Sequence, residues 1–163
     1  MSTNPTHITA PHGTPFIEVA REFDAPVALV FRASTEPGLV AQWLGPRELA
    51  MRVVEFDARA GGRYRYVHTA PDGAEYAFRG VFHTVTEELI IQTFEYEGTP
   101  GSVSLEARTL EDIGGRTRMQ QNAVFASVAA RDQALAAGME YGINDSMDRL
   151  AELLGSGAVR QGR

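Results

Sequence analysis

The spacing of apolar residues before position 50 predicts one strand followed by two short helices. Apolar and polar residues alternate over residues 16–24, which is typical of a half-buried strand. An Asp-Ala-Pro sequence then favours a helix start, and a helix over about 26–34 follows. A second short helix carries Trp43, the only tryptophan, and is expected to end at Gly45-Pro46. Helices this short are marginal in water, so they must pack on a larger surface.

From residue 50 onward the hydrophobic period changes to two, which predicts a long series of strands. Turn-forming pairs and triplets such as Gly61-Gly62 and Pro71-Asp72-Gly73 separate them. Six strands are expected, over residues 50–58, 62–69, 75–86, 89–97, 102–111 and 116–126. Because every connection is short, neighbouring strands are expected to pair antiparallel in a meander.

The last part of the chain predicts one long amphipathic helix over residues 128–154, ended by Gly155. Its apolar residues recur at intervals of three and four: Leu135, Met139, Ile143, Met147, Leu150 and Leu154. A sheet with one apolar face needs cover, and only this helix is long enough to provide it.

These elements define the expected fold class as α+β. A curved antiparallel sheet of about seven strands wraps around a long C-terminal helix, with two short helices after the first strand. Residues 16–154 are expected to form a single domain. Residues 1–15, with three prolines and no aromatic residue, are expected to be a flexible arm, and residues 155–163 a flexible tail.

Alternation within the strands predicts which side chains face the helix. In residues 62–69 the arginines alternate with Tyr64, Tyr66 and His68, so the aromatic side is expected to point inward. A hairpin at residues 71–73 would place His68 near Tyr76, and would place Tyr66 near Phe78. In the last strand Met119 and Gln121 are expected inside. The direction of residues 89–97, and with it Phe94, stays open.

Tyrosine hydroxyls, an imidazole and an amide inside a protein need hydrogen-bond partners. Either these groups satisfy one another in a packed core, or they line a cavity and orient a ligand. Gly138 and Gly142, on the inward half of the long helix, leave room for a cavity or allow close packing. The candidate ligand-binding residues are Trp43, Tyr64, Tyr66, His68, Tyr76, Phe78, Phe94, Met119, Gln121, Met139 and Ile143.

Composition narrows the function classes. The formal net charge of −6 argues against a nucleic-acid binder, which needs a basic face. No apolar run is long enough for a membrane span and no signal peptide is visible, so a cytoplasmic location is expected. Without cysteine there is no disulfide, thiolate metal site or cysteine nucleophile. The chain is expected to be a monomer or a homodimer.

A catalytic centre cannot be assembled from the sequence. The two histidines within the predicted domain, His68 and His83, are expected on opposite faces of the sheet, which argues against a catalytic triad or a shared metal. Acidic pairs such as Glu87-Glu88 fall at turns, where charges are usually solvated. No catalytic residue, metal or cofactor is therefore predicted.

Several motifs resemble one protein family. They are F-D-A-P at 23–26, T-E-P at 35–37, Q-W-L-G-P at 42–46, G-G-R-Y-R-Y at 61–66, D-G-x-E-Y at 72–76 and G-V-F at 80–82, with longer runs at 92–101 and 131–150. Together with the order of elements, they resemble the START-like (Bet v 1-like, SRPBCC) superfamily with its helix-grip fold. Within it, they are similar to the bacterial branch related to the activator of the heat-shock-protein-90 ATPase.

The resemblance covers residues 16–154 and implies a cavity between the sheet and the last helix. It places Trp43 at the cavity mouth, where the branch often has two tryptophans and this chain has Leu44 as the second. A tryptophan that only packs its short helix is the alternative. One fold hosts many functions in this superfamily.

The leading hypothesis is binding of a small apolar or aromatic molecule in the cavity, without turnover. One alternative is an interaction domain that stimulates a chaperone ATPase, which the resemblance alone motivates. A polyketide cyclase-like enzyme is the other, because such chemistry needs only a shaped pocket and one or two polar groups.

Overall fold

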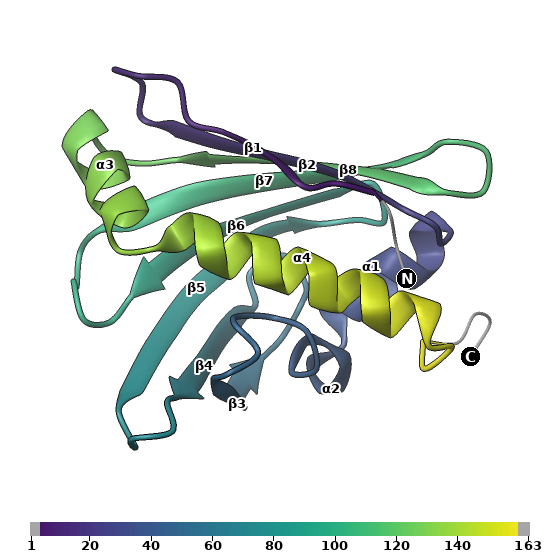
Figure 1. Ribbon diagram of the computed structural model, residues 1–163, viewed down its shortest axis with the longest axis horizontal. Coiled ribbons are helices and arrows are strands. Elements are labelled where there is room, and N and C mark those ends of the chain that lie inside the picture. Colours follow the sequence, from purple (N-terminus) through teal and green to yellow (C-terminus); the bar gives the residue numbers. More distant parts are fainter. Residues whose placement is uncertain (1–3, 160–163) are drawn as a thin grey trace.

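A curved sheet of eight antiparallel strands, with a long helix across its concave face, makes up the computed structural model, which describes residues 4–159 (Figure 1). The strand order is β1-β2-β8-β7-β6-β5-β4-β3, so β3 to β8 are neighbours in chain order. The strands are β1 (His7–Thr9), β2 (Phe16–Phe23), β3 (Ala50–Phe56), β4 (Arg63–Thr69), β5 (Glu75–Val85), β6 (Leu89–Tyr96), β7 (Val103–Asp112) and β8 (Thr117–Val124). The predicted α+β helix-grip fold and the six-stranded meander are confirmed.

Four helices accompany the sheet in the described residues: α1 (Val27–Thr35), α2 (Pro37–Val40), α3 (Val128–Ala136) and α4 (Met139–Gly155). Helix α4 crosses the sheet, with α1 and α2 near its C-terminal end and α3 near its N-terminal end (Figure 1). None of the helices within residues 4–159 is long and apolar enough to cross a bilayer.

The predicted single helix over 128–154 is wrong in one respect, because it is broken at Gly138. The backbone there has φ +93°, a left-handed conformation that glycine adopts without steric cost. The amides at the break are hydrogen-bonded to carbonyls of α3. Ala137 N–H donates to the Gln133 carbonyl, and Gly138 N–H donates to the Leu135 carbonyl. The break lets α3 turn away from α4 (Figure 1).

Part of the segment expected to be a flexible arm is a strand instead. β1 pairs with β2 through His7 opposite Ala20, which adds an eighth strand to the expected seven. Arg131 fixes this hairpin, because its buried guanidinium donates to the carbonyls of Pro11 (3.1 Å) and Phe16 (2.9 Å). Residues 1–3 of the expected arm lie outside the described residues.

The expected flexible tail is also partly ordered. Val159 is 4% exposed and packs in the core. The remainder of the tail, residues 160–163, lies outside the described residues.

Strand registers agree with the predicted faces. His68 is opposite Tyr76 and Tyr66 is opposite Phe78, as the hairpin over residues 71–73 requires. Met119 on β8 is buried, with 1% of its surface exposed.

The core is divided into two clusters. The larger cluster joins β2 and β8 to α1 and α4 through residues such as Phe23, Met119 and Leu150. The smaller cluster lies on β4, β5 and β6 and consists of Tyr64, Tyr66, Phe82 and Ile90. Phe31 and Leu44 pack against both clusters.

Candidate functional site

A cavity of about 800 Å³ lies between α4 and the concave face of the sheet, bordered by side chains of both core clusters. All eleven candidate residues border it: Trp43, Tyr64, Tyr66, His68, Tyr76, Phe78, Phe94, Met119, Gln121, Met139 and Ile143. The structure therefore brings the candidates together around one space, while their binding of a ligand stays a prediction.

The mouth of the cavity is at the α3 end of the molecule. Its exposed lining residues gather there: Thr99 and Ser102 from the β6–β7 turn, and Gln133 and Gly138 from α3 and its junction with α4. Tyr76, with 38% of its surface exposed, also borders the space.

The expected position of Trp43 at the mouth is wrong. Its ring is 2% exposed and its indole N–H donates to the carbonyl of Ala33 at 2.9 Å, so it holds the turn after α2 against α1. Trp43 therefore contributes to the inner wall of the cavity, at the end where α1 and α2 lie. Burial suits this side chain, because its large ring is apolar and its N–H has a hydrogen-bond partner.

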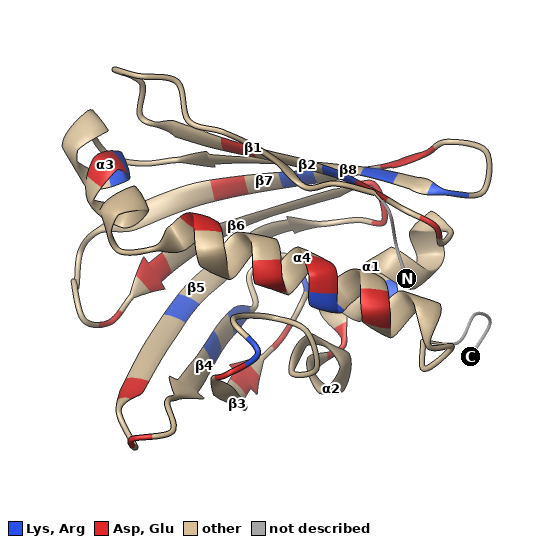
Figure 2. Cartoon of the chain, viewed as in Figure 1, with Lys and Arg blue, Asp and Glu red and all other residues tan. Residues whose placement is uncertain are grey.

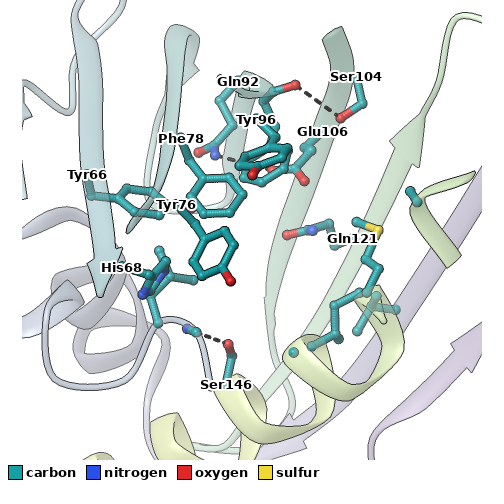
Figure 3. Close-up of a pocket in the computed structure, with 18 of the residues that line it drawn as sticks. Tyr66, His68, Tyr76, Phe78, Gln92, Tyr96, Ser104, Glu106, Gln121 and Ser146 are labelled. Carbon is teal, nitrogen blue, oxygen red and sulfur yellow. Dashed lines mark hydrogen bonds between the residues drawn. The ribbon is translucent and has the colours of Figure 1, made fainter. Parts of the chain in front are cut away.

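Aromatic rings form one wall. Phe78 is at the centre, stacked on Tyr66 and on Phe94 with ring centroids 5.4 Å apart in both pairs. Tyr96 lies at 5.2 Å from Phe78, so the direction of β6 that the sequence left open is settled, with Phe94 and Tyr96 inward. Figure 3 shows Tyr66 and Phe78 on this side of the space. Such offset stacking favours a flat apolar partner as well.

His68 extends this wall and is uncharged at neutral pH. Burial, together with the positive charge of Arg149, lowers its pKa from 6.5 to about 4. Its Nδ1 atom is buried without a hydrogen-bond partner among the described residues. The backbone of Gly45 lies directly against the ring, and a Cβ at that position would be 2.3 Å from Cε1 of His68.

Helix α4 holds the loop that carries Gly45. The Gly45 N–H donates to Oγ of Ser146 at 2.7 Å, and Arg149 donates to the Gly45 carbonyl at 2.7 Å. Arg47 in the same loop is bound by two acidic residues of α4, Asp145 and Glu152, which belong to the acidic series along that helix (Figure 2). These contacts hold the Gly45 loop, which borders the cavity, against α4.

Two ionisable side chains of β7, Glu106 and Arg108, also line the cavity, and neither was predicted. Each is held by the glutamine opposite it on a neighbouring strand. Gln92 of β6 donates to Oε1 of Glu106 at 3.3 Å, and Oε1 of Gln121 on β8 accepts from Nε and Nη2 of Arg108 at 2.9 and 2.8 Å. Burial raises the pKa of Glu106, and Arg108 opposes this change.

The sequence contained a signal that Glu106 and Arg108 face the cavity. Gln121 was expected to face inward, and the Gly114-Gly115 turn makes β7 and β8 a hairpin, so Arg108 opposite Gln121 must face the same way. Glu106, two residues earlier, follows.

The lining can bind and orient a molecule more readily than it can transform one. Within residues 4–159, no hydroxyl is hydrogen-bonded to His68, and no three His, Asp or Glu side chains are grouped so that they could hold a metal ion. The hydroxyl of Tyr64 is bonded to the carbonyl of Thr93. No nucleophile beside a base is therefore formed among the described residues.

A curved antiparallel sheet that grips a C-terminal helix around a cavity defines the class of helix-grip, START-like proteins. The chain belongs to the family described as activator of Hsp90 ATPase homolog 1-like protein, whose model matches residues 24–155. No curated protein matches it.

Solved structures of bacterial proteins share the fold over nearly the whole chain. A Mycobacterium smegmatis protein is 26% identical with a TM-score of 0.84, covering 92% of this chain and 97% of its own. A Rhodobacter sphaeroides protein is 25% identical with a TM-score of 0.85, covering 93% and 99%. A Nitrosomonas europaea protein is 27% identical with a TM-score of 0.76, covering 89% and 97%.

Proposed function

We propose that the chain binds a small hydrophobic or aromatic molecule in the cavity between the sheet and α4, without transforming it. The observation that carries this proposal is the cavity itself, which at about 800 Å³ falls within the range of about 300–1,000 Å³ of small-molecule sites. Its wall of stacked rings supplies apolar contact, and a few polar side chains interrupt it.

The energetics of apolar burial support this proposal. The space between the two core clusters opens to solvent at the α3 end, so its apolar lining contacts water when no ligand is bound. Moving an apolar molecule from water onto such a lining is favourable by roughly 25 cal/mol per Å² of apolar surface removed from water. An apolar ligand would recover the contacts that the rings of Phe78, Phe94 and Tyr96 otherwise lack.

Native mass spectrometry of the purified protein tests the proposal, followed by extraction and identification of any retained molecule. We expect a bound species, or uptake of an added aromatic compound with a stoichiometry of one. Replacement of Ile143 by Trp should weaken uptake, because the larger ring enters the cavity from α4. Asn144→Trp is the matched control, since Asn144 is the next residue of α4 and is exposed. Equal uptake by both variants would refute the cavity as the binding site.

A second candidate function is docking to a chaperone of the Hsp90 class, as the family description suggests. A row of apolar side chains on the outer face of the sheet favours it. The apolar side chains are Val81 on β5, Leu105 on β7 and Val124 on β8. Leu105 is opposite Val124 and also opposite Thr93 of β6, whose hydroxyl accepts a hydrogen bond from the N–H of Val81. Leu105 and Val81 are 49% and 44% exposed.

An ATPase assay with the cognate chaperone separates the two candidates. If docking is the function, Leu105→Glu should reduce stimulation, while Ile143→Trp inside the cavity should leave it unchanged. Absence of both stimulation and complex formation with the unaltered chain would eliminate this candidate.

A further inference from the structure

The two charged side chains of the cavity are not paired with each other. Glu106 and Arg108 are two residues apart on β7 and face the same space, yet no ion pair within 4.0 Å joins them or links either to another residue in the described part of the chain. A guanidinium inside a protein normally has a carboxylate partner, because desolvating an unpaired charge is costly. Arg108, which is half-buried, has no carboxylate within ion-pair distance among the described residues, and Glu106 acts on it only through a longer-range coulombic interaction, so a direct counter-charge is missing.

Neutral amides take the place of that counter-charge. Arg108 donates twice to the same oxygen of Gln121, which leaves its Nη1 atom without a protein acceptor in residues 4–159. The glutamine fixes the plane and direction of the guanidinium without neutralising it. A guanidinium held in this way presents the rest of its donor fork for a bidentate acceptor.

Arg108 supplies a fixed positive charge to the lining. It is the one Arg or Lys among the lining residues of the described chain. Burial lowers its pKa, but a guanidinium remains protonated in proteins. Burial raises the pKa of Glu106 and of Tyr66, which favours their uncharged forms, and His68 is uncharged as described.

Arg108 and the aromatic wall lie on different sides of the cavity. Figure 3 shows Gln121, which holds Arg108, on the β8 side of the space and Tyr66 and Phe78 on the opposite side. A ligand that spans the cavity could thus place a flat apolar body on the rings and a polar end at the guanidinium.

Building on the proposed function, we propose that the natural ligand is an aromatic or apolar acid whose carboxylate is bound by Arg108. The carboxylate supplies the missing counter-charge, and its two oxygens match the free edge of the guanidinium. The overall charge of −6 would repel an anion, so preference for an acid has to come from this local cation.

Isothermal titration with 1-naphthylacetate and its neutral analogue 1-naphthylacetamide at pH 7.5 tests the proposal. The two probes have the same ring system and differ in charge. We expect the unaltered protein to bind the acid at least fivefold more tightly than the amide. A smaller ratio, with both probes bound, overturns the inference and leaves the proposed function standing. Failure of both probes to bind overturns both.

A matched pair of substitutions at Gln121 identifies the source of the preference. Gln121→Glu gives Arg108 an internal carboxylate at the position of the present amide oxygen, so the ratio of acid to amide affinity should fall to about one. Gln121→Met removes the acceptor that orients the guanidinium but leaves the positive charge, so the ratio should stay above that of Gln121→Glu. An unchanged ratio in Gln121→Glu overturns the assignment to Arg108. Circular dichroism checks that each variant is folded. If a variant does not fold, the ratio of acid to amide affinity in the unaltered protein alone decides whether the proposal stands.

Discussion

Substitution of Gly45 by alanine tests the close contact between the backbone of Gly45 and the ring of His68. The Gly45 backbone has φ +88° and a Cβ would lie 2.3 Å from Cε1 and 2.8 Å from Nε2 of the buried His68 ring. Gly45→Ala therefore imposes two separate costs, one from the backbone and one from a clash with the ring. Gly101 offers a matched control, because its φ is also +88° and nothing lies within 4 Å of its Cβ position.

The two costs can be estimated separately. A left-handed conformation costs an alanine about 1–2 kcal/mol, which is the full cost expected for Gly101→Ala. Overpacking against a buried side chain adds about 1–3 kcal/mol, so Gly45→Ala should lose about 2–5 kcal/mol of unfolding free energy. At this chain length each kcal/mol corresponds to about 2–4 °C in melting temperature.

Urea unfolding monitored by circular dichroism measures both variants, with the slope m checked for constancy. In a His68→Ala background the clash disappears, so Gly45→Ala should then cost only about 1–2 kcal/mol. If Gly45→Ala and Gly101→Ala differ by less than about 0.5 kcal/mol, or if removal of the His68 ring gives no relief, the contact between Gly45 and His68 is refuted.

Three further predictions follow from buried groups. Trp43→Ala should lower the unfolding free energy by about 3–5 kcal/mol in urea titrations; a loss below about 1 kcal/mol would contradict the buried ring. His68 has a folded pKa lowered to about 4 from 6.5, so the unfolded state binds more protons in this window and stability should fall as pH falls from about 6.5 to 4. An NMR titration of the imidazole should have its midpoint near 4, and His68→Phe should remove that part of the pH dependence; a midpoint near 6.5 would contradict it. Arg131→Met should leave the carbonyl of Phe16 without this donor and remove the bond that ties the Pro11 carbonyl, which also accepts from Thr14, to α3; it should cost about 1–3 kcal/mol and speed hydrogen exchange in β1 (His7–Thr9). Unchanged exchange would mean that Arg131 does not fix the hairpin.

The meander and its inward faces were predictable because they depend on local patterns. Alternation of Arg63 and Arg65 with Tyr64 and Tyr66 fixes the faces of β4, and the turn at residues 71–73 carries the register into β5. Short-range turn chemistry and a period of two are sufficient for such strands.

The inward face of β7 cannot be read from the strand's own hydrophobic pattern, and only its hairpin with β8 indicates it. The apolar residues Val103 and Leu105 of β7 face solvent, while Ser104, Glu106 and Arg108 face inward. Hydrophobicity along this strand alone indicates the wrong face, since the cavity requires polar groups that a packed core would exclude.

Long-range contacts account for the other errors. The strand β1 pairs with β2, and the turn between them is bonded to Arg131, more than a hundred residues away, so the composition of β1 alone gives no sign of order. Trp43 is buried because the carbonyl of Ala33 accepts its N–H, a pairing that sequence spacing does not show. Gly138 fits an amphipathic helix as well as a break, because glycine is compatible with both backbones.

The two core clusters, which share contacts with Phe31 and Leu44, give the molecule two regions that are expected to differ in local stability. Native-state hydrogen exchange resolves such regions as cooperative units of different stability. The smaller cluster under β4 to β6 lies beside β3, the edge strand, so these amides should exchange before those of β2 and β8. A molecule held between the clusters would join them into a single unit. Exchange at β3 would then slow on binding, although only Phe56 of that strand borders the cavity.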